Sequence, residues 1–167
     1  MRAALALAAY AFISNVALAI VPHEPAVVFY GARLGVWTTT LVATAATVAA
    51  AFADVRLFGP WILRLRARHE AAGVRPGLIP RLFNRAPFAI LALSGLTPLP
   101  FFPFKALALS SGYPLRPYLA AVTVRCLPRY ALLAWLGVAV RIPAWALGLA
   151  FVVLMLPTVR LLWPRAN

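Results

Sequence analysis

A proline-broken apolar run between Leu96 and Gly137 constrains most strongly what this chain can fold into. The run begins LTPLPFFPFKALALSSGY and places Pro98, Pro100 and Pro103 close together among Leu, Phe and Ala. A continuous helix cannot hold prolines this dense, because each lacks a backbone N–H and clashes with the preceding turn. The residues at the break, FFPF, are too apolar for a loop on the surface of a soluble protein. We therefore predict a broken segment inside a membrane.

The composition also favours an integral membrane protein. Of 167 residues, 64% are hydrophobic and 11% are charged, with a mean hydropathy of +0.90. Soluble domains have about 45–50% apolar and about 25% charged residues. The net charge is +13, but 7 of the 16 Lys and Arg residues lie between Arg56 and Arg85, the one polar interval. Anionic headgroups and the positive-inside rule explain this distribution, so we expect no nucleic-acid partner.

The first half of the chain contains another apolar run that is broken by prolines. Residues 3–21 are predicted to form a membrane segment, either a full span or one leg of a hairpin. Their end, Ala17-Leu18-Ala19, also fits a signal-peptide cleavage site, but more hydrophobic sequence follows it. The break reads Pro22-His23-Glu24-Pro25. After a short apolar leg, a helix is predicted over Trp37 to Ala53, closed by Asp54.

The basic interval that follows is predicted to lie at the membrane surface. Residues Phe58 to Ala71 alternate apolar and basic positions loosely and contain Gly59-Pro60, which is typical of an interfacial amphipathic element. Residues Gly73 to Arg85 are predicted to form a connecting loop that faces the cytoplasm with it. In the amphipathic element we expect Trp61, Ile62 and Leu65 to point inward and Arg64, Arg66 and Arg68 to point toward headgroups.

The second half supplies two short legs and two longer segments. Residues Pro87 to Leu96 and Phe104 to Ser111 are each too short for a bilayer that needs about 20 residues. Joined at the proline elbow, they predict a re-entrant hairpin. Residues Leu115 to Gly137 and Ile142 to Leu162 are each long enough to cross.

An offset of 78 residues relates the two halves. Pro22 and Pro25 precede Pro100 and Pro103 by this offset, and Gly59 precedes Gly137. We predict an all-α integral membrane protein of two inverted repeats, each a re-entrant helical hairpin plus a transmembrane helix, with a final transmembrane helix. The single membrane domain, residues 1–167, divides into a first repeat (1–59), a basic connector (60–86), a second repeat (87–137) and a C-terminal helix (138–167).

Three segments together resemble a known family. The PHEP break, the segment TPLPFFPFKALALSSGYPLRPYLAA and the following VRCLPRYALLAWLG are similar to the DedA superfamily, also called the VTT or SNARE-associated Golgi domain, and nearest to its YqaA-like branch. The resemblance covers roughly Val21 to Gly137. It implies a protein of the bacterial cytoplasmic (inner) membrane that moves an anionic lipid such as undecaprenyl phosphate or a phospholipid. Bacterial members are linked to the proton motive force.

Five ionisable residues are the candidate site, because charged groups inside a bilayer are costly and are commonly functional or paired. Glu24, which matches the acidic residue of the family's first hairpin, and Asp54 are assigned to proton coupling. Arg125, Arg129 and Lys105 are assigned to the anionic headgroup, since guanidinium groups suit phosphate. Lys105 stands where the family carries arginines.

Structural alternatives exist for each of these residues. Glu24 could lie at headgroup level, and Arg125 could form a buried pair with Glu24 or Asp54. Lys105 could snorkel toward the surface, while Asp54 could stabilise a helix end with Arg56 or Arg33 as partner. His23 could relay protons beside Glu24, or be an ordinary polar residue at a break.

The expected function is lipid transport rather than catalysis. We expect no metal and no cofactor, because the chain has two histidines, three acids and one cysteine, Cys126, which we expect to pack as a small apolar residue. A membrane enzyme acting on lipid phosphates and a non-catalytic envelope-maintenance protein are the alternatives. The expected partners are the membrane and its anionic lipid, and the sequence leaves the oligomeric state open.

Overall fold

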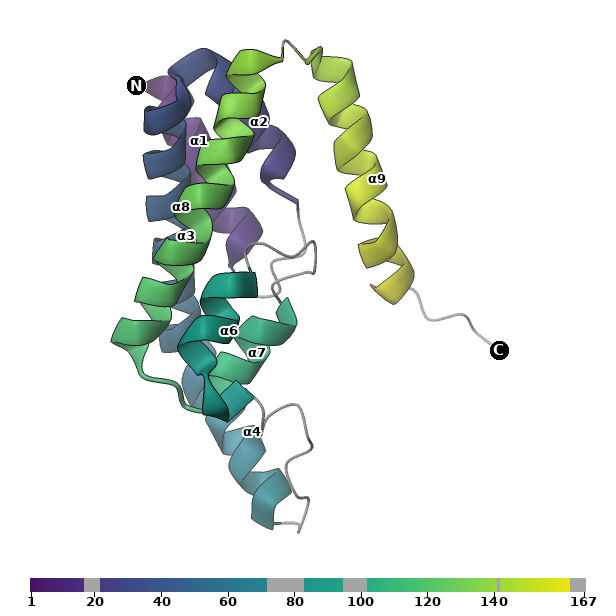
Figure 1. The fold of residues 1–167 in the computed structure, drawn as a ribbon. Coiled ribbons are helices and arrows are strands. Elements are labelled where there is room, and N and C mark those ends of the chain that lie inside the picture. The colour runs from purple at the N-terminus through teal and green to yellow at the C-terminus, as the bar shows by residue number, and fades with distance from the viewer. Residues whose placement is uncertain (17–21, 72–82, 95–101, 141, 163–167) are drawn as a thin grey trace.

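The structure is a computed structural model in which the described part of the chain, residues 1–16, 22–71, 83–94, 102–140 and 142–162, is helical (Figure 1). Two long helices, α3 and α8, run side by side, and shorter helices pack around them. The helices are α1 (Arg2–Asn15), α2 (Glu24–Leu34), α3 (Val36–Leu57), α4 (Gly59–Ala71), α6 (Pro87–Leu93), α7 (Phe102–Ser110), α8 (Leu115–Ala139) and α9 (Ala144–Leu162).

Helices α3 and α8 are long and apolar enough to cross a membrane. With 22 residues, α3 is about 33 Å long at 1.5 Å per residue, close to the thickness of a bilayer's hydrocarbon core. The predictions of helices over Trp37 to Ala53 and Leu115 to Gly137 are confirmed. Helix α3 continues to Leu57, however, so Asp54 does not close it but lies within its last turns and faces the interior.

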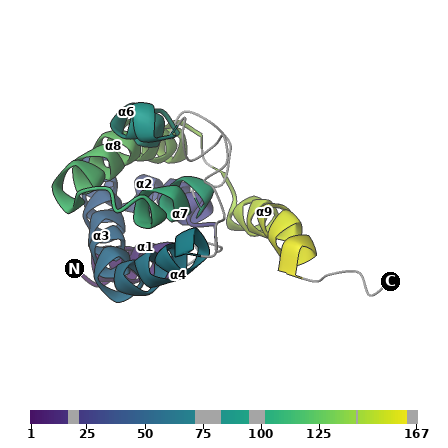
Figure 2. The same cartoon turned by 90° about the horizontal axis from the view of Figure 1, so that it is seen from below.

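The short helices cover these two long ones. Helices α1 and α2 pack on α3, while α2 and α6 pack on α8. The view along the bundle shows α2 and α7 in the middle, with α6 and α8 on one side of them and α1 and α4 on the other (Figure 2). Helices α6 and α7 have 7 and 9 residues, which confirms two short helices in this part of the chain. The proline elbow at residues 95–101 and most of the connecting loop over Gly73 to Arg85 lie outside the described residues.

The burial pattern of α3 places small and polar side chains inside and large apolar ones outside. Thr39, Ala43 and Thr47 are buried, whereas Trp37 and Leu41 are exposed. Helix α8 likewise exposes several large apolar side chains. A helix in the core of a soluble protein buries its large apolar residues instead. The exposed apolar residues of α8 are Val124, Leu127, Leu132, Trp135, Leu136 and Val138.

Two glycines bring α2 and α8 into backbone contact. A Cβ added at Gly31 would lie 2.7 Å from the Ala134 Cα, and one added at Gly137 would lie 2.9 Å from the Val28 carbonyl carbon. Both distances are far below an ordinary contact. Only glycine therefore allows this close packing, which holds the second half of α2 against the last turns of α8.

Helix α4 presents a different face to the bundle from the expected one. Ile62 is partly buried, as predicted, but Trp61 and Leu65 are exposed. Arg66 lies one turn from Ile62 and donates a 2.6 Å hydrogen bond to the carbonyl of Ser110, the last residue of α7. The carbonyl ends of a helix attract a cation, which explains why Arg66 turns inward rather than toward headgroups.

Candidate functional site

An ion pair joins the start of α2 to the middle of α8. The Arg129 Nη2 lies 2.7 Å from the Glu24 Oε1, and the two side chains are 28% and 25% exposed. Glu24 opens α2 and Pro25 follows it, a position where proline's missing N–H costs no hydrogen bond. The partial positive charge of the helix N-terminus also stabilises the carboxylate. The Glu24 carboxylate is therefore stabilised where it stands, and the pair is still reachable from outside the bundle.

A second ion pair joins α7 to α3 deep in the bundle. Lys105 pairs with Asp54, and their side chains are 4% and 0% exposed. Lys105 also donates a 2.7 Å hydrogen bond to the carbonyl of Asn15 at the end of α1. Because Lys105 sits in the first turn of α7, where the helix dipole disfavours a cation, it depends on the opposite charge of Asp54. A snorkelling role for Lys105 is excluded by this burial.

The expected partners of Asp54 are not the observed ones. The guanidinium of Arg33 lies 4.1 Å from the ring centroid of Phe29, and that of Arg56 lies 5.3 Å from the ring centroid of Phe52. Each arginine thus stacks on an aromatic side chain one turn away on its own helix. Lys105 takes the place beside Asp54 because the packing of α7 against the bundle brings it there.

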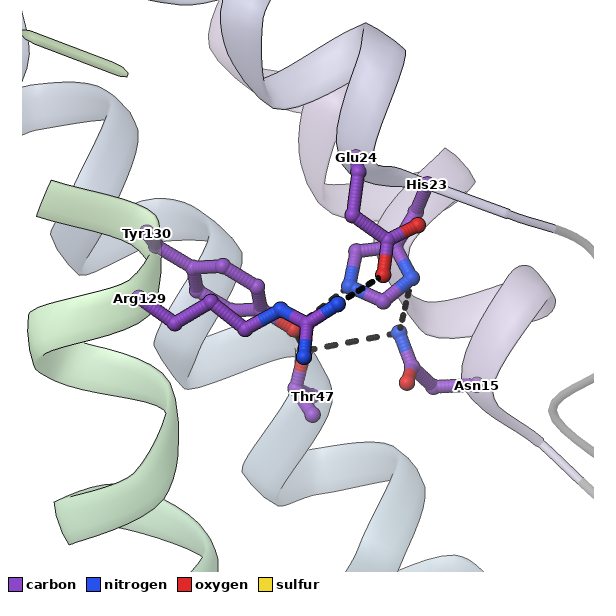
Figure 3. A network of polar contacts seen from close by, with 6 residues as sticks. All are labelled: Asn15, His23, Glu24, Thr47, Arg129 and Tyr130. Carbon is purple, nitrogen blue, oxygen red and sulfur yellow. Dashed lines mark hydrogen bonds and ion pairs between the residues drawn. The ribbon is translucent and has the colours of Figure 1, made fainter. Parts of the chain in front are cut away.

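A chain of hydrogen bonds runs beside the first ion pair (Figure 3). The Nε2 of His23 lies 2.6 Å from the Tyr130 hydroxyl, which lies 2.9 Å from the Thr47 hydroxyl. The Thr47 hydroxyl is also 2.9 Å from the Ala43 carbonyl, which can only accept. A neutral His23 protonated at Nε2 therefore gives one consistent order of donation, from His23 to Tyr130, then to Thr47, then to the carbonyl.

Asn15 connects the two ion pairs. Its side-chain amide nitrogen lies 3.4 Å from the Nδ1 of His23, which directly precedes Glu24, and 3.5 Å from the Thr47 hydroxyl. Its backbone carbonyl accepts the hydrogen bond from Lys105. Five helices, α1, α2, α3, α7 and α8, therefore contribute to one polar network, of which Figure 3 shows the part around Glu24 and Arg129.

Arg125 lies one turn before Arg129 on α8, near enough to His23 and Lys105 for its charge to act on both. Only 5% of the residue is exposed. Cys126 beside it is buried as a free cysteine, which confirms its packing role. In the described part of the chain, no three His, Cys, Asp or Glu side chains gather closely enough to hold a metal ion.

No protein-family model, curated protein or solved structure matches this chain. The resemblance to the DedA superfamily therefore stays a prediction. What the site can do has to be argued from its own contacts, burial and charge.

The structure brings all five predicted residues into one region, but pairs them in a way that the sequence did not indicate. Glu24 contacts Arg129, and Asp54 contacts Lys105. Asn15, Thr47 and Tyr130 were missed, and His23 is hydrogen-bonded to Asn15 and Tyr130. Asn15 carried one usable signal, because an amide inside a long apolar run is costly unless it is hydrogen-bonded. Thr47 and Tyr130 are common in apolar helices and carried none.

Proposed function

We propose that this chain is an integral membrane protein that moves an anionic lipid across the bilayer. The membrane location is supported by the lengths of α3 and α8 and by the apolar residues on their outer faces. It is also supported by the interior, which encloses the charged side chains of Asp54, Lys105 and Arg125 beside its apolar core. Ionisable groups enclosed by apolar helices are typical of transport pathways.

Two inverted repeats form part of the proposal. Helices α2 and α7 begin at Glu24 and Phe102, which are 78 positions apart, and the long helices α3 and α8 begin 79 apart. Helices α2 and α7 each place a charged side chain against the long helix of the other half, and the two ion pairs have opposite polarity. The acid Glu24 of α2 contacts the base on α8, and the base Lys105 of α7 contacts the acid on α3. Repeats that meet in this way form substrate sites near the bilayer midplane in known transporters.

The orientation follows from the charge bias. The basic interval that contains α4 lies at the opposite end of the bundle from the N-terminus (Figure 1). The positive-inside rule places that interval in the cytoplasm of a bacterial cell, with the chain in the cytoplasmic membrane. Arg2 then lies on the outer side.

The difference in exposure between the two ion pairs is the observation that carries the transport proposal. The Glu24–Arg129 pair is about a quarter exposed, whereas Lys105 and Asp54 are enclosed. Opening the exposed pair presents the Arg129 guanidinium to an anionic headgroup, which it can bind through two parallel hydrogen bonds. Arg125 lies one turn deeper, so a phosphate released by Arg129 meets a second guanidinium on the same helix face.

Protonation offers a way to open that pair. A protonated Glu24 no longer attracts Arg129 as an ion, and His23 lies next to it at the start of a hydrogen-bonded chain. Asp54 stands in the same relation to Lys105 on the other side of Asn15. Glu24 and Asp54 are therefore the groups that we assign to proton coupling.

The test is translocation by the purified full-length protein in proteoliposomes. Phosphatidylglycerol with a fluorescent label is placed in the inner leaflet, and its appearance outside is followed by chemical quenching. A polyprenyl phosphate is tested in parallel. We expect transfer well above that of protein-free vesicles for at least one of these lipids. If neither lipid moves, the transport proposal fails, and if inorganic phosphate is released instead, a lipid phosphatase replaces it.

A further inference from the structure

A groove lies between α2, the end of α8 and the start of α9, away from the polar network. Its volume is about 330 Å³. The floor is formed where α2 and α8 touch, and α9 forms the facing wall. Apart from one arginine the lining is apolar, and it includes Val28, Phe29, Ala32, Gly137, Ile142 and Leu147.

Arg33 is the charged residue among those that line the groove. Its guanidinium lies 4.1 Å from the ring centroid of Phe29, which holds the charge at the groove's edge. The side chain is exposed, and it makes no ion pair with a carboxylate in the part of the chain that the structure describes. A fixed, accessible positive charge next to an apolar groove is complementary to an amphiphile with an anionic head.

Two exposed tryptophans mark the level of the membrane surface at this end of the bundle. Trp37 follows the α2–α3 turn and is 75% exposed, and Trp145 lies in the first turn of α9 and is 73% exposed. Figure 1 shows both turns at the same end of the molecule. Tryptophan concentrates where hydrocarbon meets headgroups. The Arg33 end of the groove therefore lies at headgroup level, and the rest extends into hydrocarbon.

We propose that this groove holds one acyl chain of an anionic phospholipid, with the phosphate at Arg33. The volume is at the small end of the range for ligand pockets, about 300–1,000 Å³, which suits a single chain better than a helix of another protein. The inference rests on the proposed membrane location. It does not require translocation, because neither ion pair lines the groove.

Native mass spectrometry of the full-length protein in detergent tests the inference. The protein is titrated with phosphatidylglycerol and with phosphatidylcholine of the same acyl chains. We expect one tightly held phosphatidylglycerol per chain. Arg33→Gln should lower the affinity for phosphatidylglycerol about five- to tenfold, because one charge-assisted contact is lost. The affinity for phosphatidylcholine should fall less, because its choline already offsets the charge of its phosphate.

A matched pair of variants on α9 locates the bound chain. Leu147 lines the groove, whereas Leu149 is exposed two positions further on. Leu147→Trp should fill the groove and abolish tight binding of both lipids, and Leu149→Trp should bind as the wild type does. Equal binding by Arg33→Gln and wild type, or by the two tryptophan variants, overturns the inference. A dimer that Leu147→Trp dissociates also overturns it, in favour of a second copy of the chain.

Lipid binding in the groove and lipid translocation can be tested independently of each other. Glu24→Gln and Arg129→Gln change the polar network and lie outside the groove, so both should keep the tightly held phosphatidylglycerol. Lipid binding with this pattern and no translocation would support the groove and refute transport. Translocation without this binding pattern would support transport and refute lipid binding in the groove.

Discussion

The hydroxyl of Tyr130 lies 2.6 Å from the Nε2 of His23, which joins the start of α2 to the middle of α8 across 107 positions of sequence. The same hydroxyl lies 2.9 Å from that of Thr47, so α3 is held at this point as well. Three helices therefore meet at one oxygen atom with 1% of the tyrosine exposed. Removing that atom leaves two buried polar groups without this partner.

Tyr130→Phe should lower the free energy of unfolding by about 1–3 kcal/mol, because buried polar groups that lose a hydrogen bond cost about that much. Tyr118 on the same helix is the matched control. It is equally buried, and among the described residues its hydroxyl makes no hydrogen bond. Tyr118→Phe should therefore change stability by less than about 0.5 kcal/mol. Chemical unfolding in detergent compares the two variants. An equal decrease in the free energy of unfolding would show that the hydrogen bonds of the Tyr130 hydroxyl do not stabilise the protein.

Asp54→Asn should destabilise the protein more than any other single change in the network, by about 3–5 kcal/mol. It removes the charge that balances the enclosed ammonium of Lys105. Combining it with Lys105→Met should recover most of the loss, because a buried ion pair replaced by uncharged groups of similar size is often neutral. Thermal unfolding of the single and double variants measures this. A double variant no more stable than Asp54→Asn alone would contradict the assigned pair.

Gly31→Ala and Gly137→Ala should each force α2 and α8 apart. The added Cβ at either position would overlap the backbone of the other helix, and overpacking typically costs about 1–3 kcal/mol. Gly148→Ala on α9 is the control, since nothing lies within 4 Å of the added Cβ. It should be neutral or stabilising by up to about 1 kcal/mol through helix propensity. Unfolding midpoints that fall equally for all three would refute the close packing.

The positions of the long helices could be predicted from the sequence. For the site, the residues could be predicted but not which of them contact one another. Helices α3 and α8 are long, mainly apolar stretches that begin just after Gly35 and Pro114, so their ends could be placed within a few residues. Glu24 and Asp54 stood out because carboxylates are rare in apolar sequence. Their partners did not, because Lys105 reaches Asp54 through the packing of α7, which no local pattern encodes.

Helix α4 also shows that a local sequence pattern does not predict tertiary contacts. An amphipathic pattern predicts that arginines face headgroups, and it carries no information about a neighbouring helix end. Arg66 instead binds the last carbonyl of α7, because that carbonyl has no partner within its own helix. A local rule was overridden by one tertiary contact.

The account also predicts that the exposed ion pair matters for transport beyond its effect on stability. Glu24→Gln removes the carboxylate charge and the titrating group together, but leaves Arg129 available to a phosphate. Translocation by this variant should persist and lose its dependence on a proton gradient. Rates measured in proteoliposomes with and without an imposed gradient provide the check, and a gradient response equal to that of wild type would remove Glu24 from proton coupling.

The most direct test of the central claim is the rate of phosphatidylglycerol translocation by Arg129→Gln in proteoliposomes. Arg68→Gln is the control, because Arg68 is an exposed cation on α4, outside the network. Loss of a bidentate charge contact worth about 1.5–3 kcal/mol predicts a rate at least about tenfold below wild type for Arg129→Gln. The control should match wild type. Equal rates for all three proteins would contradict the claim that Arg129 receives the headgroup.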